Sequence, residues 1–382
     1  MTALRAGNAL LCLLALGGAL DRGPALSAQT AEEQVEPRAR PDRDMLPGSF
    51  QENREGLDRA VLRGLAHLSR QQYDDGHIGN YRYRIAITAL GGLAFMAGGS
   101  TVTTGPHATQ VRRAVEFFLD LRGSQETEEW HINASDDGSR LHGHGFATLF
   151  LAQAHGSCGG WERREELGLR LREAVQLIIR SQEPRGGWGY IPQDTLHEGS
   201  ITVTQLQALR AARDTGIVVP QATINGALQY LEDSARTRTD WAFFVYRLGT
   251  ASPPSFPLAA AAISSLNAVG AYHSPTVEKG LNFMRRYVPQ PGRQNAHQVR
   301  DERYTQFWFY GQLYAAQAMF QSGGSDWELW WPAIRDTLLR EQAADGSWGH
   351  SSAEARYGYA YPTAVACIIL QIPDRLLPIL HR

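Results

Sequence analysis

Two histidines separated by one glycine, His142 and His144, are the most distinctive polar residues that could carry chemistry. His131 and the carboxylates Asp136 and Asp137 lie a short distance before them. Imidazole transfers protons near neutral pH and can bind a transition metal together with carboxylates, but a zinc site needs three or four ligands in a fixed geometry, so no metal site is predicted. The candidate catalytic residues are His142, His144, Asp136 and Asp137. The alternative is that the histidines begin a helix and bond to neighbouring loops.

Aromatic side chains gather in the segments that precede the most apolar stretches of the chain. Their rings can stack on sugar faces, contact cations or bind apolar chains. The alternative is that they pack the wall between structural units. The candidate ligand-binding residues are Tyr81, Tyr83, Trp130, His131, Tyr190, Trp241, Tyr304, Trp308, Tyr310 and Tyr359.

Acidic residues occur in the same segments, which leaves glycan chemistry open. A glycosidase needs two carboxyl groups facing each other across the sugar, about 5–5.5 Å or 6.5–9.5 Å apart. The sequence does not give these separations. The acidic residues concerned are Asp75, Asp136, Asp137, Asp194, Glu198 and Asp301.

A repeat indicates which elements must position these residues. Three segments share a Gln, a Gly four residues later, an apolar residue at the sixth position after the Gln and a Gly at the seventh: 72–79, 182–189 and 342–349. Their starts differ by 182 − 72 = 110 and 342 − 182 = 160 residues, which are two and three periods of about 53–55 residues.

A second set of residues gives the same period. Apolar runs end in a glycine, which suits the left-handed residue that closes a helix, or just before a proline, which prevents the helix from continuing. These run ends predict six units between Leu57 and Pro373. The runs end at Gly98, Gly156, Gly216, Gly270, Gly323 and Ile372.

Each unit is predicted to contain two helices. The first has apolar residues at i, i+4 and i+7, as at Val61, Leu65 and Leu68, with charged residues between them. The second is apolar almost all round, as in residues 257–270, so other helices must enclose it. The sequence therefore predicts an all-α fold, an (α/α)6 toroid with six wet helices outside six apolar ones. A linear solenoid is the alternative.

Composition and the N-terminal segment limit the function further. With 37 Lys and Arg against 39 Asp and Glu and no basic cluster, the chain is not expected to bind nucleic acid. The apolar run 9–20 is too short to span a bilayer comfortably, so residues 1–28 are predicted to be a signal peptide, with an uncleaved membrane anchor as the alternative. Residues 29–54 then form a disordered linker and 55–382 the toroid. We expect an exported protein, periplasmic or extracellular, with no later transmembrane segment.

The repeated segments QAADGSWG and QEPRGGWG, with the degenerate QQYDDGHIG, resemble the Gln–Trp repeat of the squalene cyclase and prenyltransferase repeat family. The resemblance implies an α/α toroid in which the Gln and Trp residues are structural. The Asp-x-Asp-Asp acid of the cyclases has no counterpart here, and Tyr361-Pro362-Thr363 stands where the zinc-binding prenyltransferases have Tyr-His-Thr. We therefore expect no cofactor and no bound metal.

The leading hypothesis is an exported repeat protein whose central cavity binds an apolar ligand such as an isoprenoid, with catalysis unproven. A narrow or filled cavity would count against it. The alternatives are a terpene cyclase-like enzyme with a non-standard acid, a glycan-active hydrolase or lyase, and a protein-interaction scaffold. The sequence does not identify a protein partner.

Overall fold

The computed structural model describes residues 54–79, 81–122, 129–134, 137–290, 298 and 300–380. The predicted signal peptide over 1–28 and the linker over 29–54 lie outside the described residues, except for Arg54, which begins the first helix. The candidate Asp136 also lies outside them.

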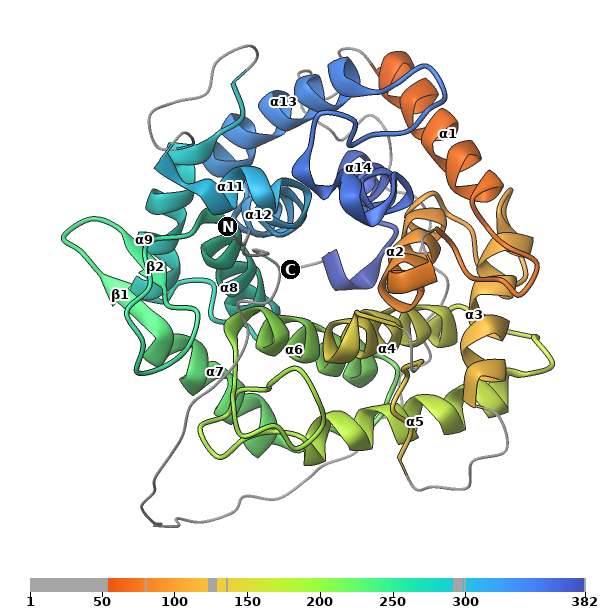
Figure 1. Cartoon of the computed structure of the whole chain (residues 1–382), viewed down its shortest axis with the longest axis horizontal. Coiled ribbons are helices and arrows are strands. Elements are labelled where there is room, and N and C mark those ends of the chain that lie inside the picture. The colour runs from red at the N-terminus through yellow and green to blue at the C-terminus, as the bar shows by residue number, and fades with distance from the viewer. Residues whose placement is uncertain are drawn as a thin grey trace, which may run out of the picture. The chain divides into compact units, whose positions relative to one another are not determined.

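Two sets of helices alternate along the described chain (Figure 1). The outer set is α1 (Arg54–Arg70), α3 (Ala108–Arg122), α5 (Arg164–Arg180), α7 (Gln221–Ser234), α9 (Pro275–Met284) and α13 (Gly324–Glu341). The inner set is α2 (Arg84–Ala97), α4 (Arg140–Gly156), α6 (Gly199–Asp214), α8 (Phe256–Ala268), α12 (Trp308–Ser322) and α14 (Ala360–Gln371). Short elements connect them: η3 (Tyr81–Tyr83), β1 (Ala235–Thr237), β2 (Ala242–Phe244), η4 (Arg285–Tyr287), α11 (Glu302–Gln306), η5 (Ala353–Tyr357), η6 (Ile372–Asp374) and η7 (Pro378–Leu380). β1 and β2 form an antiparallel pair.

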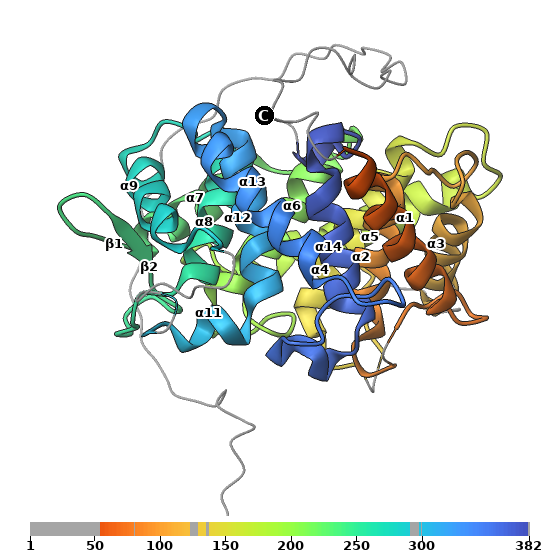
Figure 2. The ribbon, with the colours of Figure 1, turned by 90° about the horizontal axis from the view of Figure 1, so that it is seen from above.

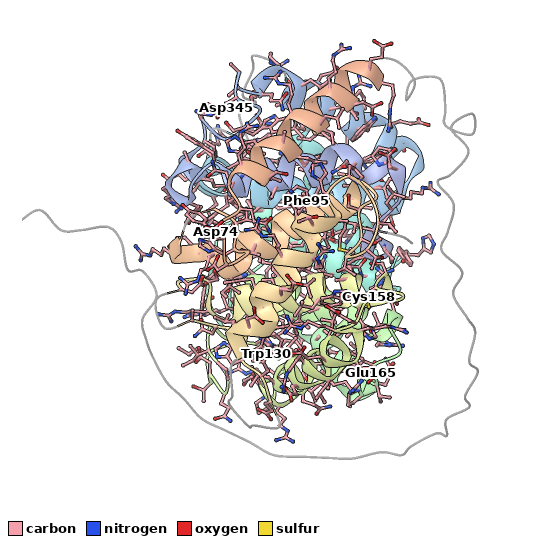
Figure 3. All side chains as sticks on the ribbon, turned by 90° about the vertical axis from the view of Figure 1, so that its right-hand side faces the viewer. Asp74, Phe95, Trp130, Cys158, Glu165 and Asp345 are labelled. Atoms are coloured by element: carbon pink, nitrogen blue, oxygen red, sulfur yellow. The ribbon has the colours of Figure 1, made fainter. Side chains whose placement is uncertain are left out.

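The inner helices close into a ring. Each packs against the next in the order α2, α4, α6, α8, α12 and α14, and α14 returns to α2 (Figure 1). The predicted toroid of six helix pairs is confirmed, and the linear solenoid is wrong. Apolar side chains fill the wall between the two rings, and Phe95 on α2, labelled in Figure 3, is among the largest that are fully buried.

The helices differ in burial as their sequences predict. The outer helix α1 buries Leu57, Leu65 and Leu68 and exposes Leu62. Every residue of the inner helix α8 is buried. An outer helix therefore needs only one apolar stripe, whereas an inner helix is enclosed on all sides.

The glutamine of each repeated segment joins two units. The side-chain amide of Gln342 donates to the carbonyl of Gly346 in its own turn, at 3.0 Å, and to that of Ala60 on α1, at 2.8 Å. The equivalent bonds run from Gln72 to Gly76 and Gln110, and from Gln182 to Gly186 and Thr223. Because Gln342 reaches the first helix, its turn joins the last unit to the first.

The tryptophans of the repeat are buried and bonded in the same way. The indole N–H groups of Trp188 and Trp348 donate to the carbonyls of Ile178 and Leu338, each at 2.7 Å. The structural role that the resemblance implied for these residues is confirmed.

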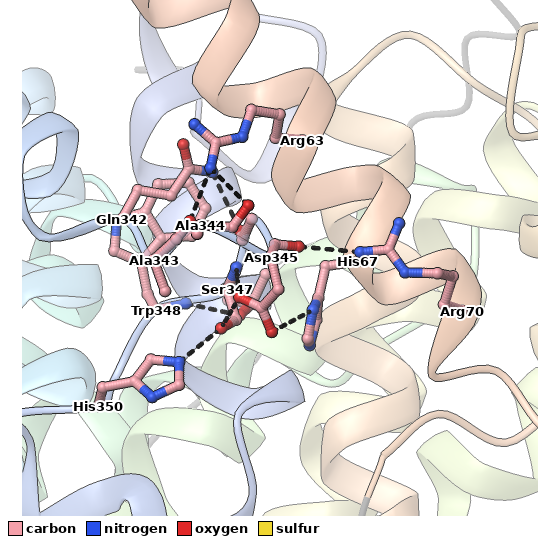
Figure 4. A network of polar contacts seen from close by, with 12 residues as sticks. Arg63, His67, Arg70, Gln342, Ala343, Ala344, Asp345, Ser347, Trp348 and His350 are labelled. Carbon is pink, nitrogen blue, oxygen red and sulfur yellow. Dashed lines mark hydrogen bonds and ion pairs between the residues drawn. The ribbon is translucent and has the colours of Figure 1, made fainter.

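The joint between the last turn and α1 contains further polar contacts (Figure 4). Arg63 donates to the carbonyls of Ala343 and Ala344, at 2.7 and 3.0 Å, and Arg70 donates to that of Asp345, at 2.9 Å. Arginine side chains of the first helix thus satisfy carbonyl groups of the last unit, which fixes the closure of the ring.

The two ends of the ring are different. Since outer and inner helices alternate, all the inner helices run in the same direction, and we call the end at which they begin the mouth; α11 lies at this edge in the side view (Figure 2). At the opposite end, η6 contacts α12 and η7 contacts α6. Leu377 and Ile379 are buried there. The C-terminal segment therefore covers the far end, and the mouth is the end left for a site.

Candidate functional site

Buried acids cap inner helices at the mouth. The carboxylates of Asp137, Asp301 and Glu354 accept hydrogen bonds from the first backbone N–H groups of α2, α8 and α12, at 2.7–3.0 Å. Each acid comes from the loop before the next inner helix, so it joins two units. A carboxylate at a helix N-terminus satisfies unpaired N–H groups and complements the helix dipole.

Glu198 caps α6, the helix that follows it. Its carboxylate accepts from the backbone N–H groups of Ser200 and Ile201, at 3.1 and 3.3 Å, and both of its oxygens lie 2.7 Å from the Ser200 hydroxyl. The Tyr190 hydroxyl also donates to it. Glu198 has no accessible surface, and burial raises its pKa.

These bonds belong to a longer chain of polar groups. The Nε2 atom of His142 lies 3.0 Å from the Ser200 hydroxyl, and the hydroxyls of Tyr190 and Tyr246 are 2.6 Å apart. His142, Ser200, Glu198, Tyr190 and Tyr246 are thereby connected. Burial lowers the pKa of His142 to about 4, so its ring is neutral at physiological pH.

A second acid lies at the mouth beside α12 and α14. Glu354 accepts from the hydroxyl of Tyr361, at 3.2 Å, and burial raises its pKa to about 7. The rings of Tyr310 and Tyr314 meet edge to face at 4.8 Å, and neither hydroxyl has a hydrogen-bond partner among the described residues. The charge of Glu198 contributes, after burial and Tyr314, to the raised pKa of Tyr310, so the two acidic groups lie near a shared set of phenols.

Accessibility changes sharply with depth. The side chains of His142, Ser200, Tyr310 and Tyr361 are half-buried at the mouth. One turn deeper on the inner helices, Phe146, Leu313 and Leu90 are only 8, 4 and 2% exposed. The accessible layer is therefore polar and aromatic, and the layer beneath it is buried, with apolar side chains beside polar ones such as Gln205 and Tyr314.

His144 is placed away from the mouth. Its Nδ1 accepts from the backbone N–H of Ile132 at 3.1 Å, and its Nε2 donates to the carbonyl of Ala174 on α5, also at 3.1 Å. Burial lowers its pKa to about 3, and its nearest ring is His131, at 5.7 Å. Since residues two apart on a helix face roughly opposite sides, His142 and His144 do not form one site. His144 belongs to the wall, and so does His131.

The other predicted residues divide between wall and mouth. Trp130 is buried and bonded through its backbone to Glu173 on α5; its place in the wall can be followed in Figure 3. Trp241 stacks on Phe283 of α9, at 5.3 Å, and is also a wall residue. Asp137 has both oxygens occupied by backbone N–H groups, of Ile85 and Ser139, so it is a cap rather than a free acid.

Of the remaining aromatic candidates, Tyr190 and Tyr310 belong to the mouth cluster described above. Tyr304 is buried and accepts from the indole N–H of half-buried Trp308, at 3.2 Å. Tyr83 meets Tyr357 edge to face at 5.1 Å, and Tyr359 is 40% exposed and stacks on His350. The backbone of Tyr81 lies in η3, and its side chain is outside the described part.

Five mouth residues were absent from the sequence-based candidates: Ser200, Tyr246, Tyr314, Glu354 and Tyr361. Glu354 lies in η5 and accepts from the backbone of Phe309 on α12, 45 residues earlier in the sequence, so no local pattern marks it. Tyr361 stands in a run of tyrosines that did suggest a binding surface.

Two further features can be reported for the described part of the chain. It contains no group of three or more His, Cys, Asp or Glu side chains placed to hold a metal ion. None of its helices combines the length and the apolar character needed to cross a bilayer.

No protein-family model and no curated protein matches the sequence. Solved structures with a similar fold include the type II terpene cyclase MstE from Scytonema in its apo form, with a TM-score of 0.56 and 14% identity over 85% of this chain and 99% of that one. Cellobiose 2-epimerase from Bacillus thermoamylovorans B4167 has a TM-score of 0.60 and 13% identity over 86% of this chain and 100% of its own. A glycosidase variant in complex with glucose has a TM-score of 0.53 and 16% identity, covering 87% and 100%.

These similarities establish the class of fold. The chain is an α/α toroid of the kind found in squalene-cyclase-like terpene cyclases, which confirms the resemblance suggested by the repeat. The same fold carries glycosidase and epimerase activities in other proteins, so the site has to decide the function.

Proposed function

We propose that the mouth binds a small polyhydroxylated molecule, a sugar or short glycan, and performs acid–base chemistry on it. One observation carries the proposal: the accessible side chains at the mouth are phenols, a hydroxyl and an imidazole, whereas the side chains one turn deeper, both apolar and polar, are buried. Aromatic faces with hydrogen-bonding groups at their edges suit a ligand that is stacked and hydrogen-bonded at once.

Glu354 supplies the acid in this proposal. With a pKa of about 7, a substantial fraction of its carboxyl groups is protonated at neutral pH, which is the state a general acid requires. Glu354 itself has no accessible surface, so the carboxyl gives its proton to the Tyr361 oxygen while the Tyr361 hydroxyl gives its own proton to the ligand. The glycosidase and the epimerase that share the fold support a sugar as ligand.

The test is calorimetric titration of the protein with cellobiose and glucose. We expect saturable binding that Tyr361→Phe weakens about tenfold, the effect of losing one hydrogen bond to a charged or polar partner. Tyr73→Phe, at an exposed position, is the matched control and should bind like wild type. Absence of binding by wild type, or equal affinities for both variants, would rule out a sugar site at the mouth.

An isoprenoid is the second candidate ligand, and the fold that the chain shares with MstE favours it. Phe146, Leu149 and Leu258 are only 8, 5 and 6% exposed, so an isoprenoid chain requires side chains beneath the mouth to move. MstE was solved with geranylgeranyl dihydroxybenzoate, whose polar head and apolar chain would match the two layers. Titration with geranylgeranyl dihydroxybenzoate distinguishes the two candidate ligands. If the protein binds this compound and does not bind cellobiose, the isoprenoid is favoured over the sugar.

We also propose that the protein is exported to the periplasm or beyond. The short apolar run 9–20 followed by Leu26-Ser27-Ala28 supports this. Mass spectrometry of the protein from its native cells should find a mature chain that begins close to residue 29. A chain that still begins at Met1 would contradict it.

A further inference from the structure

Glu198 is a buried acid that can exchange a proton with the mouth only through its neighbours. It has no accessible surface, whereas His142, Ser200, Tyr190 and Tyr246 are half-buried. The bonded chain reaches the accessible surface at two places, through Ser200 to His142 and through Tyr190 to Tyr246. Capping α6 requires only the carboxylate of Glu198. It does not require a hydrogen-bonded chain that continues from Glu198 to the half-buried side chains of His142 and Tyr246.

The hydrogen-bond directions can be worked out when Glu198 is ionised. A carboxylate only accepts, so the one hydroxyl proton of Ser200, 2.7 Å from both oxygens, points to Glu198. The Ser200 oxygen is then left to accept from His142, which fixes the proton of the neutral imidazole on Nε2. The Nδ1 atom has no partner among the described residues and is the free acceptor of a half-buried ring.

We propose that His142, Ser200 and Glu198 form a proton relay in which His142 is the group that accepts a proton from the ligand. The relay rests on the proposed ligand site. In the forward step, a ligand O–H gives its proton to Nδ1 of His142. The Nε2 proton passes to the Ser200 oxygen, and the Ser200 hydroxyl proton passes to Glu198. The ligand becomes an alkoxide, Glu198 becomes a neutral carboxyl, and His142 ends neutral with its proton on the other nitrogen.

The environment of each group suits this step. Burial disfavours a charged imidazolium at His142, and the relay never requires one to persist, because the ring releases one proton as it takes up another. Burial also raises the pKa of Glu198, which makes the carboxylate a better proton acceptor than an exposed one. Tyr190, which donates to Glu198, can accept from it instead when the carboxyl is neutral.

The experiment uses nitrogen NMR of the full chain to read the position of the proton on His142, assigned by the signal lost in His142→Gln. We expect the Nε2–H form in wild type at neutral pH. In Glu198→Gln, the new amide can donate to Ser200, so the hydroxyl should turn toward His142 and shift the ring to the Nδ1–H form. Ser200→Ala should leave a mixture of both forms.

Asp194→Asn is the matched control, because Asp194 caps the same loop through the backbone N–H groups of Tyr190 and Leu196 without touching Ser200. It should keep the Nε2–H form. An unchanged tautomer in both Glu198→Gln and Ser200→Ala, with folding confirmed by circular dichroism, would overturn the relay. This readout needs no ligand, so it can fail while a sugar still binds, or succeed when none does.

Turnover measurements then distinguish a chemical role of His142 from a role in packing alone. If a substrate is found among the sugars that bind, His142→Gln should lower kcat by 10²-fold or more with little change in KM, since the loss of a positioned base acts on the chemical step. Equal turnover in this variant would also overturn the proposal.

Discussion

The turn around Gln342 and the phenols Tyr310 and Tyr314 at the mouth both place polar groups in buried surroundings, but they differ in whether those groups are hydrogen-bonded. At the turns, the side-chain amide of Gln342 uses its donors on two carbonyls, and one of them belongs to the next unit. At the mouth, the hydroxyls of Tyr310 and Tyr314 are bonded to none of the described residues, and burial raises the pKa of Glu354 to about 7.

This difference separates stability from function. A satisfied buried polar group contributes to folding, whereas an unsatisfied hydroxyl or a buried acid lowers the free energy of unfolding. Groups held in that unfavourable state gather at functional sites. Substitutions in the turns should therefore cost stability, and substitutions at the mouth should cost binding.

The largest effect on stability is expected at Gly186. Its φ is +89°, and a Cβ there would overlap the carbonyl of Gly226 on the neighbouring outer helix. Gly186→Ala should lower the free energy of unfolding by more than about 3 kcal/mol, because the backbone must move. Gly160, with a φ of +75° and nothing within 4 Å, is the matched control, and Gly160→Ala should cost only about 1–2 kcal/mol. If urea denaturation gives the same loss of unfolding free energy for Gly186→Ala and Gly160→Ala, the close approach of Gly186 to the Gly226 carbonyl does not matter for stability.

Removing the Gln342 side chain comes next. Gln342→Ala deletes the bonds to Ala60 and Gly346 and should cost about 1–3 kcal/mol. The control is Gln221→Ala, whose exposed side chain bonds, among the described residues, to Asn225 four residues along its own helix. Denaturation midpoints of the two variants give the comparison; a Gln342→Ala protein as stable as the control would contradict a role in closing the ring.

Glu354 should make the stability fall as the pH rises. Its pKa is about 7 in the folded protein against 4.5 for an ordinary glutamate, so the folded state holds the proton more tightly. The contribution is fully present below the unfolded value and is lost between about pH 4.5 and pH 7, by at most about 3 kcal/mol. Glu354→Gln has no such proton, so its stability relative to wild type should rise over this range. Glu328→Gln, at an exposed position, is the control. A difference in the free energy of unfolding between Glu354→Gln and wild type that stays constant from pH 4.5 to pH 7 would contradict the raised pKa of Glu354.

The turns could be predicted from the sequence and most of the mouth could not, for a physical reason. Gln342, Gly346 and Trp348 act within one short segment, so their spacing is visible along the chain. Glu354 accepts from the backbone N–H of Phe309, 45 residues before it, and Tyr310 is near Glu198 only because the ring closes. His142 lies in the first turn of α4, as the alternative interpretation of the histidine pair predicted, but the His-Gly-His motif does not show that the helix separates it from His144.

The smallest effect on stability and the most specific effect on function are expected at Tyr310. Its hydroxyl has no bond to lose among the described residues, so Tyr310→Phe should change the free energy of unfolding by less than about 0.5 kcal/mol or raise it slightly. A ligand that uses this hydroxyl should bind about tenfold more weakly.

Calorimetric titration of cellobiose into Tyr310→Phe and Gln342→Ala, each folded at the temperature used, tests the division between turns and mouth most directly. We predict that the mouth variant loses affinity about tenfold at wild-type stability, while the turn variant is less stable and binds like wild type. Equal affinities for the two variants, or a loss confined to Gln342→Ala, would contradict a functional site at the mouth.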